Sequence, residues 1–325
     1  MLARGQAGHQ REGMIKPPQV ATIIVGAMLS ACLLLFSPDP AAATPVAAPS
    51  VAATSPPAAT QPPAAPHMRA YLFRGALGPI FSRGMDHLAE RIEQAGIPAD
   101  VNEFTICRLI AEGAIRKYRE DPALIVLIGH SMGGYCVLQF SQMLQAEGIA
   151  VSLAVMIEPP QISPPVPLNI ERCINIFLSK DVLGGSHIKT ARGYQGHFAS
   201  FDLSQHDEVF HVTIDKMDDV HAQLIAKILQ LATTPAKAGG EAVPLNYVVP
   251  PGSAIELWDS GMPVFARPGD TLQSIAELYH VPLWSLTQVN KGVAESAPLV
   301  PGERVVVPRH LLPPAEVSGP SPARR

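Results

Sequence analysis

The spacing of apolar residues divides the chain into segments of different character. From residue 68 to residue 232, short unbroken apolar runs alternate with longer stretches in which apolar residues recur every three or four positions. Unbroken apolar runs are typical of strands buried on both faces of a parallel sheet, whereas the longer spacing is typical of helices that pack one side on a core. This alternation predicts an α/β domain over 68–232.

Within this domain the pattern predicts a mostly parallel, doubly wound sheet of about six strands. The strands are expected at 69–74, 98–104, 123–129, 151–159, 173–181 and 208–215. Helices are expected at 85–96, 105–121, 133–148 and 218–232. So compact a sheet leaves no room for a large cap domain.

A second patterned block covers residues 262–308, where a short strand is followed by two short helices and a returning strand. The segments around the two blocks, 37–67, 233–261 and 309–325, are rich in proline and small residues. Such a composition does not bury a core, so we expect two extended linkers and a Pro-rich tail.

The N-terminal part of the chain contains an uncharged apolar run at residues 20–36. As a helix it would be about 26 Å long, the low end of what a bilayer requires. Basic residues occur in the preceding segment, 1–19, and none follows until Arg69, which predicts a cytoplasmic N-terminus and an exported remainder. We expect a signal peptide or an inner-membrane anchor, and a periplasmic or cell-envelope location. The letters LSAC, ending at Cys32, leave a lipoprotein as a third alternative.

Composition narrows the classes of function. The formal net charge is -4 and no basic run is present, which argues against nucleic acid as a partner. The four cysteines show neither CxxC nor His-rich spacing, so no metal site is expected. Cys107, Cys136 and Cys173 occupy positions typical of buried free thiols.

The residues Gly129-His130-Ser131-Met132-Gly133 join a predicted strand to a predicted helix. Gly-x-Ser-x-Gly in this context is the pattern of a nucleophile elbow, a sharp turn that presents a reactive serine. The flanking glycines let the chain turn tightly and let the strand and the helix approach each other. Ser131 is therefore the candidate nucleophile.

An acid and a histidine follow this serine at the ends of later predicted strands, where ligands of open α/β sheets bind. Asp181 ends the strand 173–181, and His221 follows the last predicted strand. With this order of Ser, Asp and His, residues 68–232 resemble a small α/β-hydrolase of the lipase, esterase and thioesterase kind. The segment FRGALGPIF is similar to the His-Gly-x-x-Gly loop of bacterial lipases, with Arg74 in place of histidine.

The resemblance implies nucleophilic attack by Ser131, with His221 as the general base and Asp181 orienting the imidazole. It implies backbone N–H groups of Met132 and Ala76 as the oxyanion donors. This mechanism requires no cofactor. Two assignments stay open, because each has rivals: Glu158 for the acid, and His187, His197, His206 and His211 for the base.

Residues 262–308 resemble a LysM module over their whole length, and the resemblance implies a βααβ fold that binds glycans containing N-acetylglucosamine, above all peptidoglycan. In that family the groove lies between the loop before the first helix and the loop before the second strand. Asn290 has an equal claim to a role as a cap of the second helix. The candidate glycan contacts are Gly269, Asp270, Thr271, Leu272 and Asn290, and further matching residues are Pro301-Gly302 and Pro308.

The whole sequence predicts an exported or membrane-anchored serine hydrolase that acts on an ester or thioester and is localised at the cell envelope by peptidoglycan. Two alternatives remain: an inactive hydrolase-fold scaffold whose only role is glycan binding, and an amidase that acts on wall peptides.

Overall fold

The computed structural model describes residues 67–181 and 185–309. The predicted apolar segment 20–36, with its flanking segment 1–19 and most of the first linker, lies outside the described residues. Within the described ranges, none of the helices combines the length and the hydropathy needed to cross a bilayer.

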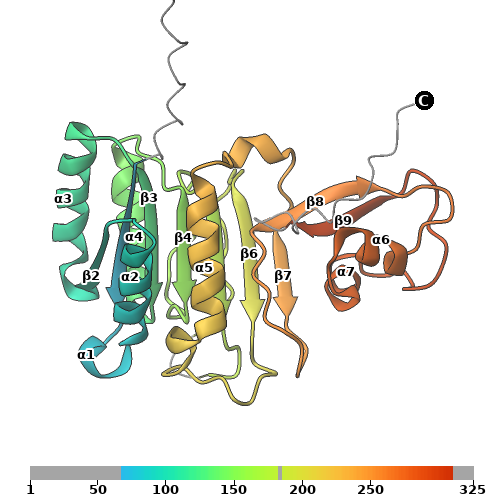
Figure 1. The fold of residues 1–325 in the computed structure, drawn as a ribbon, viewed down its shortest axis with the longest axis horizontal. Coiled ribbons are helices and arrows are strands. Elements are labelled where there is room, and N and C mark those ends of the chain that lie inside the picture. Colours follow the sequence, from blue (N-terminus) through green and yellow to red (C-terminus); the bar gives the residue numbers. More distant parts are fainter. Residues whose placement is uncertain (1–66, 182–184, 310–325) are drawn as a thin grey trace, which may run out of the picture. The chain divides into compact units, whose positions relative to one another are not determined.

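The main sheet has seven strands, all parallel to their neighbours, and confirms the predicted α/β class (Figure 1). Its order is β2-β1-β3-β4-β5-β6-β7. The strands are β1 (Met68–Arg74), β2 (Ala99–Glu103), β3 (Leu124–His130), β4 (Leu153–Ile157), β5 (Arg172–Phe177), β6 (His197–Asp202) and β7 (Leu245–Val248).

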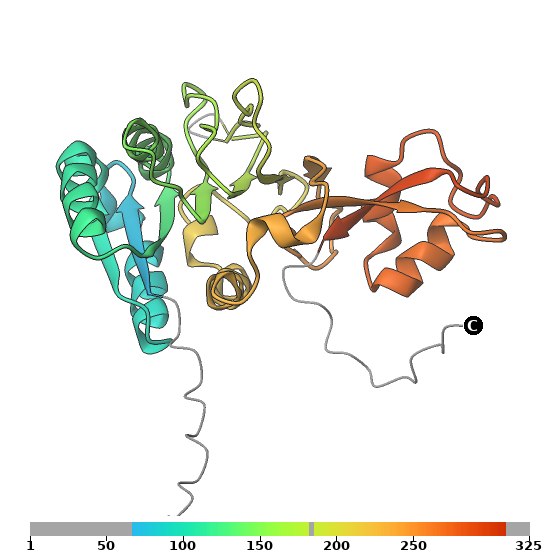
Figure 2. The ribbon, with the colours of Figure 1, turned by 90° about the horizontal axis from the view of Figure 1, so that it is seen from above.

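Helices cover both faces of this sheet, as Figure 2 shows from above. On one face, α3 and α4 pack over the apolar side chains of β1, β3 and β4. On the other face, α2 and α5 pack over a second apolar layer that continues to β7. The helices are α1 (Gly78–Phe81), α2 (Gly84–Gln94), α3 (Cys107–Glu120), α4 (Met132–Ala146) and α5 (Asp218–Leu231), with 3₁₀ turns η1 (Phe104–Ile106), η2 (Ile214–Lys216) and η3 (Ala236–Gly239).

Two strands differ from the expectation. Residues 208–215, predicted as the last strand, form turns and η2, and the strand next to β5 is β6 instead. The segment 233–261, predicted as a linker, contributes β7, which pairs in parallel with β6. Both differences matter for the candidate site, because the loop that follows β6 runs from residue 203 to residue 217 and contains no strand.

The C-terminal block folds as predicted, in the order β8 (Ser260–Phe265), α6 (Leu272–Tyr279), α7 (Leu283–Val289) and β9 (Arg304–Arg309). β8 and β9 pair antiparallel. Thr271 caps α6 in a reciprocal capping box with Ser274, which satisfies two N–H groups at the start of the helix. Leu272 and Leu286 are fully buried in a small core of their own.

This block packs directly on the edge of the main sheet. Trp284 of α7 contacts Tyr247 of β7 and Trp258, with ring centroids 5.6 and 5.7 Å apart. The side-chain amide of Gln288 accepts from the N–H of Val248 at 2.9 Å and donates to its carbonyl at 2.7 Å. These contacts cover the outer edge of β7 with α7.

The structure corrects the prediction that the cysteines are free thiols. Cys107 at the start of α3 and Cys136 in α4 form a disulfide, whereas Cys173 is a buried free thiol. Their positions on two neighbouring helices, 29 residues apart in the sequence, gave no local signal for this pairing.

Candidate active site

Ser131 occupies a strained turn between β3 and α4. Its backbone angles are φ 54° and ψ -123°, a combination that is costly for a residue with a side chain and is found mainly at functional sites. A Cβ atom at Gly129 would collide with the backbone of Gly133, and one at Gly133 would collide with the Phe73 carbonyl. The predicted elbow glycines are therefore required by close packing. The N–H of Ser131 donates to the Ile157 carbonyl at 2.8 Å, which joins the turn to the end of β4.

The loop after β1 lies beside this serine. A Cβ atom at Gly75 would come within 2.7 Å of Ser131 Cβ and 3.2 Å of its Oγ, so the Gly75–Ala76 segment is next to the candidate nucleophile. The Gly75 N–H donates to Ser82 Oγ at 3.1 Å, and Ser82 Oγ also pairs with His130 Nδ1 at 2.8 Å. Met132 is the first residue of α4, where helix N–H groups and the helix dipole favour negative charge.

Arg74, which stands where bacterial lipases have histidine, has a structural partner on each side of the loop. Its guanidinium forms ion pairs with Asp86 of α2 and with Glu103 of β2, the latter at 3.0 Å. The hydrogen bond with Asp86 raises the pKa of Arg74 above its usual value. These pairs fasten the start of the loop to two neighbouring elements.

A histidine and a carboxylate form a close pair near the elbow. His211 Nδ1 lies 3.0 Å from Glu158 Oε2. Glu158 directly follows β4, is fully buried, and accepts a hydrogen bond from the N–H of Leu178 through its other oxygen. The His211 carbonyl accepts from His130 Nε2 at 2.9 Å, so the backbone of this histidine is attached to the residue before Ser131.

Asp181 belongs to the same group. One ligand atom each of Glu158, Asp181 and His211 lies within 4.8 Å of the others, an arrangement that could also hold a metal ion. Burial raises the pKa of Glu158, the bond from His211 opposes that change, and the charge of Asp181 adds to it. The Glu158–His211 hydrogen bond joins two members of this cluster directly.

His221, the histidine predicted from the sequence, has a different partner. It lies in the first turn of α5, is 2% exposed, and its Nε2 contacts the backbone carbonyl of Asp215 at 2.7 Å. Burial lowers its pKa. The structure thus joins Asp181 with His211 rather than with His221. The reason is the corrected strand order: the loop after β6 runs from residue 203 to 217, and His221 is already inside the helix.

The remaining rival histidines have structural partners of their own. His197 is buried in β6 and bonds to Ser260 Oγ at 2.7 Å and to the Ala236 carbonyl at 2.8 Å. His206 pairs with Glu208 at 3.0 Å, and His187 lies 3.3 Å from Ser200 Oγ. Sequence reasoning held Glu158 and His211 only as rivals. The sequence signal for Glu158 was its position directly after a buried strand.

The predicted glycan contacts lie at the start of α6 and the end of α7. Gly269 is exposed with φ +90°, whereas Leu272 is a core residue. The Asp270 carboxylate accepts from the N–H of Arg267 at 2.8 Å. The Asn290 amide donates to the carbonyls of Leu286 and Val306 and accepts from the N–H of Val306. Side chains at these positions therefore shape the loops, and the exposed backbone near Gly269 is the part open to a ligand.

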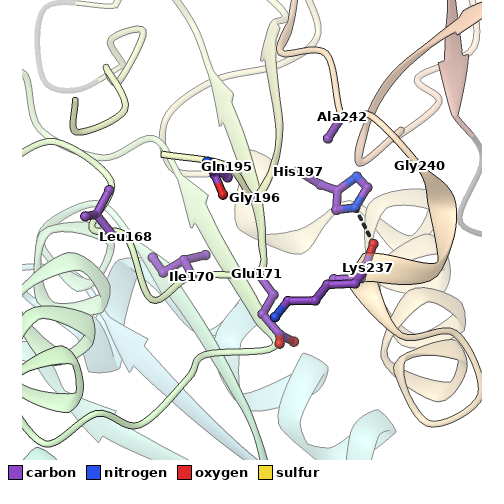
Figure 3. A pocket seen from close by; sticks show the side chains of 10 residues that line it. Leu168, Ile170, Glu171, Gln195, Gly196, His197, Lys237, Gly240 and Ala242 are labelled. Atoms are coloured by element: carbon purple, nitrogen blue, oxygen red, sulfur yellow. Dashed lines mark hydrogen bonds between the residues drawn. The ribbon is translucent and has the colours of Figure 1, made fainter. Parts of the chain in front are cut away.

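A cavity of about 350 Å³ lies at the amino ends of β5 and β6, whereas Ser131 lies at the carboxyl end of β3. Figure 3 shows Lys237 and Glu171 beside it and the bond from His197 to the backbone of η3. Ligands of such sheets bind at the carboxyl ends of strands, so we do not assign this cavity to the chemistry of Ser131.

Comparison with known proteins identifies one domain. Residues 266–308 match the LysM domain model, so this block is a LysM domain. A solved structure from Xanthomonas campestris pv. campestris, assigned to the alpha/beta superfamily of hydrolases, is 16% identical; the match covers 56% of this chain and 86% of that chain, with a TM-score of 0.27. A search of curated proteins finds no match. A likeness this weak carries no argument about activity, which has to come from the site itself.

Proposed function

We propose that residues 68–232 are a serine hydrolase domain in which Ser131 is the nucleophile, His211 the general base and Glu158 the acid, and that the LysM domain holds the enzyme on peptidoglycan. One observation carries the proposal. Ser131 follows β3 and Glu158 follows the paired strand β4, and the Ser131 N–H donates to the carbonyl of Ile157, the residue before Glu158. His211 pairs with Glu158 through Nδ1, and its carbonyl accepts from His130, the residue before Ser131. A serine on a strained turn near a carboxylate-paired histidine supports nucleophilic activation.

The chemistry follows from these positions. Ser131 Oγ attacks the carbonyl carbon of an ester or thioester while His211 Nε2 accepts its proton, because Nδ1 is engaged with Glu158. The negative charge on the carbonyl oxygen is stabilised by the N–H groups of Met132 and Ala76. The protonated histidine then donates to the leaving alcohol or thiol. Water, deprotonated by the same histidine, then attacks the acyl carbon. The bond from this carbon to Ser131 Oγ breaks, Oγ takes the proton from the histidine, and the acid leaves.

The disulfide between Cys107 and Cys136 supports export, because disulfides persist in oxidising compartments such as the periplasm. A LysM domain in the same chain supports a location at the cell wall. We therefore propose the cell envelope as the place of action. The predicted N-terminal anchor or signal peptide stays part of this proposal.

Labelling with a fluorophosphonate probe tests the catalytic assignment. The native chain should be labelled on Ser131 and should hydrolyse short p-nitrophenyl esters, and Ser131→Ala should lose both properties. Ser141→Ala, a buried helix serine whose Oγ donates to the Val137 carbonyl, is the matched control. Absence of labelling in natively folded protein would leave only the scaffold alternative. Release of peptide from purified walls, without ester hydrolysis, would favour the amidase.

A further inference from the structure

The main sheet has a polar face between β5 and β7. Asn175, Ser200 and Asn246 are register neighbours on β5, β6 and β7 and therefore form one row across three strands. Strands of a parallel sheet covered on both sides normally carry apolar side chains on both faces. The opposite face of these strands follows that rule, with Ile174, Ile176, Ala199, Phe201, Leu245 and Tyr247 in the core. The polar row therefore calls for a separate explanation.

This polar face is the floor of a cleft of about 530 Å³, a volume within the range of ligand sites. One wall is α7 and the residues after it, which belong to the LysM domain. The other wall is the loop that carries His187. The lining of the cleft includes Ser200, Asp202, Asn246, Tyr247, Thr287 and Lys291.

Hydrogen bonds fix the polar groups of the floor. Asn175 Nδ2 donates to Ser200 Oγ at 3.0 Å. Ser200 Oγ also lies 3.3 Å from His187 Nδ1. Asp202 Oδ1 accepts from the N–H groups of Ser179 and Ser204. Hydroxyl, imidazole and amide groups held in this way, beside one carboxylate, suit the hydroxyl and amide groups of a ligand.

Charge and shape restrict the ligand further. Lys291 and Asp202 are of opposite sign, so the lining as a whole does not select a strongly charged molecule. Phe177 and Val248 add apolar surface of the kind that contacts the C–H face of a sugar ring. Lys291 directly follows Asn290, where the loop predicted to contact glycan begins, and it also lines the cleft. The loop predicted to contact glycan therefore continues into the wall of the cleft.

We propose that this cleft is a second saccharide subsite, which takes N-acetylated amino-sugar units of a glycan strand continuing from the LysM domain. The inference rests on glycan binding by the LysM domain in the proposed function, and it is independent of hydrolysis by Ser131. It makes the hydrolase domain a participant in wall recognition, since the floor of the cleft belongs to β5, β6 and β7.

Titration calorimetry on the full chain carrying Ser131→Ala tests this. The probes are a dimer, a tetramer and a hexamer of N-acetylglucosamine, and soluble peptidoglycan strands of matched length. The hexamer should bind at least about 10-fold more tightly than the dimer, because only the longer chain reaches the hydrogen-bonding groups of the cleft. Asn246→Ala combined with Thr287→Ala, two residues of the cleft lining outside the predicted groove loops, should remove most of this gain and leave dimer binding unchanged.

The matched control combines Asn102→Ala with Thr233→Ala, an asparagine on the opposite edge strand β2 and an exposed threonine that, like Thr287, donates to a carbonyl three residues earlier. It should bind every probe as the parent does. Absence of dimer binding would contradict the proposed glycan function itself. Dimer binding with no gain for longer chains, or a gain that survives the cleft substitutions, would overturn the subsite alone.

Discussion

Two histidines lie close together in the sequence but contact different groups. His211 belongs to the loop 203–217, and His221 belongs to the first turn of α5. His211 in the loop pairs with the buried Glu158 carboxylate. His221 in the helix contacts a backbone carbonyl and is almost fully buried. A carboxylate partner stabilises the imidazolium that forms when a base takes a proton, and a single carbonyl does so less. Our proposal therefore selects His211 as the base by its partner and not by its position after a strand end.

The difference between His211 and His221 is tested most directly by two separate variants, each with one of these histidines replaced by glutamine. His211→Gln should lower kcat/KM for p-nitrophenyl esters on the order of 10⁴-fold, because the base and its proton relay are lost. His221→Gln should stay within about 10-fold of the native value, since it alters only packing and a bond to the backbone carbonyl of Asp215. Steady-state kinetics after confirming the fold by circular dichroism measures both. The reverse ranking would reinstate the assignment made from sequence.

The two acidic residues near His211, Glu158 and Asp181, are tested in the same way. Glu158→Gln should lower kcat by about 10³-fold, because a neutral amide no longer stabilises the protonated base. Asp181→Asn should have a smaller effect, since Glu158 Oε2 lies 3.0 Å from His211 Nδ1 and the Glu158 side chain is fully buried, whereas Asp181 is partly exposed. Kinetics of both variants with the same ester decide the point. A larger loss for Asp181→Asn would show that the acid follows β5 instead of β4.

Gly75→Ala tests the nucleophile region without touching either histidine. The added methyl group would lie 2.7 Å from Ser131 Cβ and must displace the turn or the loop that supplies an oxyanion donor. Loss of one such donor costs about 10²-fold to 10³-fold in kcat, and we expect a loss of this order. Gly113→Ala is the control, because its nearest neighbour would be 3.8 Å away. Equal activity of both variants would place the loop outside the site.

Asp215 lies between the two histidines in the sequence, and its titration is expected to change the free energy of unfolding. Burial raises its pKa from 3.8 to about 6. Its contribution to stability is therefore complete below pH 3.8 and is lost as the pH rises through 6. Asp215→Asn removes this loss, so the variant should gain up to about 3 kcal/mol relative to the native chain between pH 4 and pH 8. Urea unfolding at both pH values measures the gain, and the exposed Asp207→Asn should show none.

Most elements of the fold were predictable from apolar spacing because they are long or continuously apolar. The strands β1 and β3 and the helices α2, α4 and α5 all lie within about two residues of their predicted bounds. β6 was missed because His197, Ser200 and Asp202 interrupt its apolar pattern. Its polar groups are satisfied by distant partners such as Ser260 and Ala236, which local sequence does not reveal.

The proposed site follows from the sequence as far as Ser131, whose neighbours in the chain predict the turn that the structure forms. The partners of a serine come from distant segments, so their choice depended on knowing which strand was last. Reading 208–215 as a strand hid His211 inside it and directed the search to His221. The pairing of Glu158 with His211 is a tertiary contact across 53 residues, and no spacing rule encodes it.

The cross-link between α3 and α4 has a practical consequence for anyone who prepares this protein. Cys136 is one turn into the helix whose first N–H is the proposed oxyanion donor, so the helix bearing the elbow is tethered to its neighbour only after oxidation. Material made in a reducing bacterial cytosol would carry two thiols there instead. Its turnover should be judged only after refolding with a glutathione couple or secretion through an oxidising route.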